Sequence, residues 1–82
     1  MPTVLRKDGF SFMIYPDDHE PSHTHVKKVG KEVVINLGDA QTAPYMRENK
    51  GMPKQDVRKA LKLAYEYQDD LIAAWEEIHS ND

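Results

Sequence analysis

Three of the four histidines of the chain lie in one short segment, residues 17–25. His23 and His25 are two residues apart, so on a β-strand their imidazole rings would project to the same face. This is the geometry of a His-x-His metal arm, to which His19 or a loop carboxylate would add a third ligand. The first hypothesis is therefore a divalent transition-metal site at His19, His23 and His25; no other cofactor is expected.

The same histidines could act without a metal, as the general base and general acid of a ribonuclease. Imidazole titrates near neutrality, which suits both proton transfers in the attack of a ribose 2′-hydroxyl. Lys27 follows on the same strand face and would supply a cation for the charge on phosphorus. The catalytic candidates are His23, His25 and Lys27. The alternative is a polar surface that contacts a partner, with Lys27 paired to Glu32.

Basic residues on a predicted helix form a second candidate site. Lys54, Arg58 and Lys62 recur every four residues and could contact a nucleic-acid backbone, or could simply form a solvated helix face. The whole chain has a net charge of −3, and residues 66–82 carry six acidic and no basic side chains. Non-specific nucleic-acid binding is disfavoured by this balance, whereas the acidic end favours a basic protein partner.

Composition excludes several classes of protein. The chain has 82 residues and no cysteine, so thiolate zinc sites, iron–sulfur clusters, disulfides and cysteine nucleophiles are excluded. Hydrophobic residues make up 39% and charged residues 30%, which indicates one small globular domain, residues 1–82. The N-terminus lacks an apolar secretion signal, and no apolar run approaches the roughly 18 residues of a membrane span. We therefore expect a cytoplasmic protein that does not contact a membrane.

Alternating apolar and polar residues predict four strands, at residues 3–7, 10–15, 23–28 and 31–37. Asp8-Gly9 and Val29-Gly30 predict tight turns, which would join the strands into two antiparallel hairpins. The predicted cross-strand pairs are Leu5 with Phe12, Val4 with Met13, Lys27 with Glu32, Val26 with Val33, His25 with Val34 and His23 with Asn36.

This register places His23, His25 and Asn36 on one sheet face and Val26 and Val33 on the other. We expect the histidine face to lie exposed and outside the core. Replacement of both histidines should then leave stability nearly unchanged, because exposed strand residues contribute little to it.

From Pro53 the hydrophobic period becomes helical and predicts helix over residues 54–79, with Pro53 in the first turn. Either one long helix or two shorter helices fit the pattern, with a break near residues 67–70 where Asp69 would cap a second helix. Residues 38–52 are expected to form a connection with one helical turn at 45–49. The apolar stripe of the helical segment consists of Val57, Leu61, Ala64, Leu71, Trp75 and Ile78.

The expected fold class is α+β: a small antiparallel four-stranded sheet of two hairpins, packed against one long or two shorter C-terminal helices. Three segments of the chain resemble the uncharacterised bacterial domain-of-unknown-function family 4160. They are MPTVLRKDGFSFMIY, DDHEPSHTHV and LIAAWEEI, and from the first to the last of them the resemblance extends over residues 1–78. The most specific part is HEPSHTHV, where family members usually have a second proline in place of Ser22.

The resemblance implies no established activity, but it implies a partner. Genes of this family often lie beside genes of another uncharacterised, helix-turn-helix-containing family, an arrangement similar to toxin–antitoxin pairs. We therefore expect a small cytoplasmic component of a toxin–antitoxin-like two-gene module that binds a cognate protein from the neighbouring gene. The alternative is a His-dependent ribonuclease or metal-binding protein that uses His19, His23 and His25, with RNA as a partner in the first case.

Overall fold

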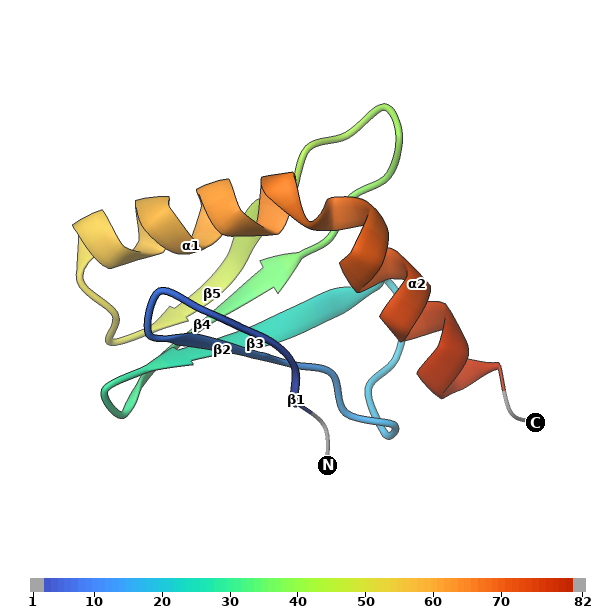
Figure 1. The fold of residues 1–82 in the computed structure, drawn as a ribbon, viewed down its shortest axis with the longest axis horizontal. Helices are drawn as coiled ribbons and strands as arrows, with labels where there is room; N and C mark the ends of the chain where they lie inside the picture. The colour runs from blue at the N-terminus through green and yellow to red at the C-terminus, as the bar shows by residue number, and fades with distance from the viewer. Residues whose placement is uncertain (1–2, 81–82) are drawn as a thin grey trace.

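The computed structural model describes residues 3–80, which form one antiparallel sheet and two helices. The sheet order is β1-β2-β3-β4-β5, so each strand lies beside the next one along the chain. Helix α1 runs along one face of the sheet, and α2 turns down past its end (Figure 1). The elements are β1 (Thr3–Lys7), β2 (Phe10–Met13), β3 (His23–Lys28), β4 (Lys31–Asn36), β5 (Tyr45–Lys50), α1 (Lys54–Glu66) and α2 (Gln68–His79).

Two tight turns join the first four strands in pairs, β1 with β2 and β3 with β4, as predicted. Asp8 and Gly9 have φ values of 53° and 84°, and Val29 and Gly30 have values of 49° and 78°. Positive φ at both central residues is the conformation of a turn whose twist matches the twist of the flanking strands. The two hairpins of the predicted fold are therefore confirmed.

The predicted strand register is correct except at the start of β1. All four predicted pairs between β3 and β4 are present, and Leu5 pairs with Phe12. The pair of Val4 with Met13 is wrong, because an irregularity between Thr3 and Leu5 pairs Thr3 with Met13 instead. Since side chains alternate between faces, the β3–β4 register decides which residues share a face with the histidines.

A fifth strand is the main difference from the predicted four-stranded sheet. Residues 45–49, expected to form a helical turn, lie within β5, which pairs antiparallel with β4. All six residues of β5 are exposed. No alternation of apolar and polar residues therefore marks the strand in the sequence, and the strand is defined by its backbone pairing with β4.

The C-terminal segment forms two helices, separated by Tyr67. The amide of Tyr67 donates to the Leu63 carbonyl and that of Leu71 to the Tyr67 carbonyl, both at 2.9 Å, so hydrogen bonding continues across the bend. The prediction that Asp69 caps α2 is wrong, because Asp69 lies inside the first turn. Pro53 likewise precedes the first turn of α1 rather than lying within it.

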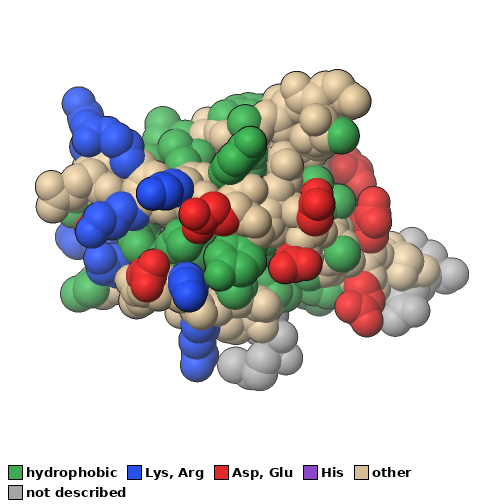
Figure 2. Space-filling view, turned by 45° about the horizontal axis from the view of Figure 1, so that its top comes forward, with side chains coloured by type: hydrophobic (Ala, Val, Ile, Leu, Met, Phe, Trp, Pro, Cys, Tyr) green, Lys and Arg blue, Asp and Glu red, His purple; other side chains and the backbone are tan. Residues whose placement is uncertain are grey.

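Charges on the helices are separated along the molecule. The three basic candidates Lys54, Arg58 and Lys62 are exposed on α1. Figure 2, which turns the α1 side toward the viewer, shows Lys and Arg gathered at one end, some Asp and Glu side chains beside them, and only Asp and Glu among the charged side chains toward the other end. The exposed acidic residues from the end of α1 onward are Glu66, Asp69, Asp70, Glu76 and Glu77.

No helix in the described part of the chain is long and apolar enough to cross a membrane.

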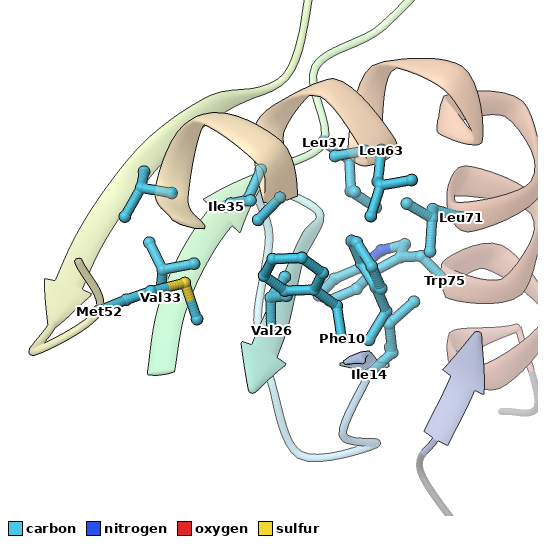
Figure 3. Close-up of a cluster of buried hydrophobic side chains, with 14 residues drawn as sticks. Phe10, Ile14, Val26, Val33, Ile35, Leu37, Met52, Leu63, Leu71 and Trp75 are labelled. Carbon is cyan, nitrogen blue, oxygen red and sulfur yellow. The ribbon is translucent and has the colours of Figure 1, made fainter. Parts of the chain in front are cut away.

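The hydrophobic core lies between the sheet and the helices (Figure 3). Val57, Ala64, Leu71 and Trp75 of the predicted stripe are buried there, while Leu61 and Ile78 only pack against its edge. Trp75 extends from α2 into the cluster formed by the strand side chains. The core residues are Phe10, Phe12, Ile14, Val26, Val33, Ile35, Leu37, Met52, Val57, Ala60, Leu63, Ala64, Leu71 and Trp75.

Replacement of Trp75 by alanine should lower the free energy of unfolding by about 3–5 kcal/mol, because it removes a large buried aromatic side chain. Tyr65→Ala is the matched control, since Tyr65 is 64% exposed whereas Trp75 is 3% exposed. The control should change stability by less than about 0.5 kcal/mol. Urea denaturation of both variants measures the difference, and equal small shifts would contradict the assignment of Trp75 to the core.

Candidate functional site

His23 and His25 project from β3 on the sheet face opposite α1, together with Asn36 of β4, as the register predicted. The expectation that this face is exposed is wrong, because two of these side chains are buried and that of His25 is only 17% exposed. His23 is 5% exposed and Asn36 is 8% exposed. The ring of Trp75 covers His23, with the ring centroids 5.2 Å apart, because α2 turns past the end of the sheet where β3 begins (Figure 1).

Asp18 brings a carboxylate to both histidines. Its Oδ2 atom lies 3.2 Å from Nε2 of His23 and 3.1 Å from Nε2 of His25. The three atoms all lie within 4.8 Å of one another, which is the spacing of potential metal ligands. His19 is exposed and does not belong to this group. The structure thus brings Asp18, rather than His19, to the histidine pair.

The other ring nitrogens contact two further acceptors. Nδ1 of His23 lies 2.9 Å from the Pro21 carbonyl oxygen, and Nδ1 of His25 lies 2.9 Å from Glu32 Oε2. Arg47 Nη1 also lies 3.1 Å from Nδ1 of His23, but one nitrogen cannot donate to Pro21 and accept from Arg47 at once. The carbonyl is fixed in the backbone whereas Arg47 has a long exposed side chain, so we place the proton on Nδ1.

Glu32 lies between one imidazole and two lysines. Burial alone would raise the pKa of its carboxyl, but the hydrogen bond with His25 and the charges of Lys50, His25 and Lys27 outweigh burial and hold the pKa below its ordinary value. Nζ of Lys27 is 4.0 Å and Nζ of Lys50 is 3.7 Å from the Glu32 carboxylate. Lys27, a predicted catalytic cation, is therefore adjacent to Glu32, on the histidine face.

The loop that carries Asp18 is fixed to α2 as well as to β3. The carbonyl oxygen of Asp18 lies 3.0 Å from Nε2 of His79, and Trp75 Nε1 donates to Glu20 Oε2 at 3.3 Å. The rings of Trp75 and His79 stack with centroids 3.8 Å apart. His79 was not identified from sequence, because more than 50 residues separate α2 from this loop.

The remaining candidates are on the other side of the molecule. Lys54, Arg58 and Lys62 belong to α1, which covers the sheet face opposite the histidines. One nucleic-acid phosphate therefore cannot contact both groups. Arg47 and Lys50, which precede the helical basic residues in the sequence, belong to β5, a strand that the sequence did not predict, and contact the histidine face instead.

A family described as Domain of unknown function (DUF4160) matches residues 9–76. The chain belongs to this family. The matched region includes the segment 19–26, which supplies both clustered histidines, and most of α2. A search of curated proteins and a search of solved structures gave no match. The family description names no activity, so function must be argued from the site.

The ionised Glu32 side chain should stabilise the fold in a pH-dependent way. Because its folded-state pKa is lowered, this contribution is fully present above the ordinary value of 4.5 and is lost as pH falls through the folded value. The stability difference between the protein and its Glu32→Gln variant should therefore be smaller at about pH 3 than at about pH 5. Urea denaturation at each pH, with a chelator present, tests this, and a pH-independent difference would contradict it.

Proposed function

We propose that this chain binds a divalent transition metal through Asp18, His23 and His25. The proposal depends on one observation, the convergence of three acceptor atoms. If Nδ1 of each ring donates to Pro21 or Glu32, each neutral imidazole presents the lone pair of Nε2 to the Asp18 carboxylate. Each Nε2 atom would then be an acceptor facing another acceptor, Asp18 Oδ2, at 3.2 Å for His23 and 3.1 Å for His25. Two acceptors at such a distance repel one another unless a cation lies between them. A metal ion is such a cation.

Two observations support this proposal: the distances between the ligand atoms, and the hydrogen bonds that the Nδ1 atoms of the two histidines make. Zinc bound at about 2.0–2.1 Å in a tetrahedral site separates its ligand atoms by roughly 3.3–3.4 Å, close to the contacts of Asp18 with the two histidines. Metal-bound histidines usually donate their other ring N–H to a carbonyl or carboxylate, which Pro21 and Glu32 provide. Two imidazoles and one carboxylate favour zinc and its neighbours over magnesium or calcium.

Protons are the alternative cations. If both rings were imidazolium, they would share the Asp18 carboxylate, and His23 and His25 would be the acid and base of the ribonuclease hypothesis. A metal titration separates the two cases, because stoichiometric binding at neutral pH requires that the metal displace any proton from both Nε2 atoms. In the metal-bound case, three protein ligands would leave a fourth coordination position for water or an anionic oxygen. Catalytic zinc sites have such an open position, whereas structural zinc sites do not.

Isothermal calorimetry with zinc chloride at pH 7.5 should show one site per chain. His25→Gln should weaken zinc binding by at least about 100-fold, and Glu32→Gln, which removes the outer partner of His25, by about 10–100-fold. His19→Gln is the matched control, because His19 is exposed and outside the cluster, and it should bind zinc as the wild type does. His23 is left intact because its ring is buried.

Binding should also weaken steeply below about pH 6, where protons compete for imidazole nitrogens. Two results would contradict the metal proposal. One is the absence of heat with both zinc and nickel at neutral pH. The other is equal zinc affinity of His25→Gln and His19→Gln, which would indicate adventitious binding to surface histidines.

A second proposal concerns the acidic end of the molecule. The described residues from 66 onward carry five exposed carboxylates and no lysine or arginine, while Asp82 lies outside the described residues. We propose that this surface binds the basic surface of a cognate protein, as a component of a cytoplasmic toxin–antitoxin-like two-gene module. The negative charge of this surface and the gene arrangement implied by the resemblance to the family support this proposal.

Co-expression with the product of the neighbouring gene tests the second proposal. Reversal of charge by Glu76→Lys with Glu77→Lys should abolish co-purification, and added salt should weaken the wild-type complex. Lys54→Glu with Arg58→Glu is the matched control at the basic end and should not reduce binding. Undiminished binding by the Glu76/Glu77 variant would contradict the proposal. Induction of the chain alone and with its neighbour tests for toxicity.

A further inference from the structure

The sheet face that carries the metal ligands also carries a set of side chains suited to a nucleic-acid strand. We propose that this face binds single-stranded RNA, with backbone phosphates at three cations, a base on an exposed tyrosine and a donor group at a buried amide oxygen. The proposal rests on the metal binding proposed above, because the metal adds positive charge to this face. The side chains are Lys27, Arg47, Lys50, Tyr45 and Asn36.

The three cations lie around the histidine cluster. Lys27 and Lys50 contact the same Glu32 carboxylate at 4.0 and 3.7 Å, and their side chains are 44% and 48% exposed. Such long, exposed ion pairs contribute little, so either ammonium group can turn toward a phosphate at small cost. Arg47 reaches Nδ1 of His23 because β5 is irregular there: Glu48 and Met46 pair with successive residues of β4, and Arg47 pairs with neither.

The charge of this face depends on the metal. The carboxylates of Asp18, Glu32 and Glu48 offset most of the positive charge of this face, and Glu48 shares the face of His25 because it pairs with Val34. Arg6 is a fourth cation on the face, since it pairs with Ser11, which pairs with Lys27. A divalent ion at the Asp18 site adds two positive charges to the face and provides an open position for an anionic oxygen. RNA affinity should therefore follow metal occupancy.

Tyr45 and Asn36 occupy one cross-strand row with His23. Tyr45 is 50% exposed, and an exposed aromatic ring beside cations is the common platform for an unpaired base. Asn36 is 8% exposed, and its Oδ1 atom has no hydrogen-bond partner among the described residues. Buried polar atoms are nearly always paired, so this acceptor points to a donor on a ligand. A ribose 2′-hydroxyl is such a donor.

Fluorescence anisotropy with a labelled single-stranded RNA tests the proposal on the full chain, loaded with one equivalent of zinc. The variant Lys27→Gln/Arg47→Gln/Lys50→Gln should lose at least roughly tenfold in RNA affinity while zinc calorimetry still shows one site. The slope of log affinity against log salt should fall from about −2, expected for three phosphate contacts on a single strand, toward zero. Removal of zinc by a chelator should also reduce RNA affinity.

Two matched controls separate this face from the helix face. Tyr45→Ala should weaken RNA binding roughly tenfold, whereas Tyr65→Ala, an exposed tyrosine of α1, should not change it. The variant Lys54→Gln/Arg58→Gln/Lys62→Gln on α1 should bind RNA as the wild type does. If the α1 variant loses affinity instead, the RNA site lies on the helix and the proposal is overturned.

Failure of this proposal and failure of metal binding give different results. Normal zinc calorimetry without RNA binding would overturn the RNA proposal alone, and so would RNA binding that the triple variant retains. RNA binding that chelation does not change would overturn the charge argument. Equal affinity for single-stranded DNA of the same sequence would overturn the assignment of the ligand as RNA.

Discussion

One residue, Asp18, joins parts of this structure that are far apart in the sequence. Its Oδ2 atom lies within 3.2 Å of both clustered histidines of β3, and its backbone carbonyl oxygen contacts His79 of α2. A buried imidazole such as His23 is costly unless its nitrogens have partners: Nδ1 donates to the Pro21 carbonyl, and Nε2 faces the Asp18 carboxylate across the position of the proposed cation. Without this loop, the polar end of β3 would be buried against Trp75 with unpaired nitrogens.

Trp75 couples the site to the core. Leu71 and Trp75 are the buried residues of α2, so the placement of that helix depends on few apolar contacts. Trp75 also touches the site directly, through the His23 ring and the Glu20 carboxylate. A change at the histidine cluster is therefore transmitted to the packing of α2. This is the physical reason why binding and stability must be measured together in any variant of His23.

The sheet separates two surfaces of different chemistry. Its α1 side carries the hydrophobic core and, beyond it, the exposed lysines and arginine of α1. Its other face carries the histidines, their carboxylates and the cations of β3 and β5. Because strand side chains alternate, a single register fixes both sets at once. The metal and RNA proposals belong to the second surface, and the protein-partner proposal belongs to the acidic end formed by α2.

The sequence by itself determined the local features of this protein. Asp8-Gly9 and Val29-Gly30 defined both hairpins, and alternation in β3 and β4 placed His23 and His25 on one face. Helical periodicity identified Trp75 as a core residue. Tertiary structure alone decided three other features: β5, whose exposed residues show no apolar alternation; Asp18 rather than His19 as the third group of the cluster; and the burial of His23 under Trp75. Turns and periodicities depend on neighbouring residues, whereas a proline-containing loop and contacts across 50 residues have no local pattern, so only the folded chain sets them.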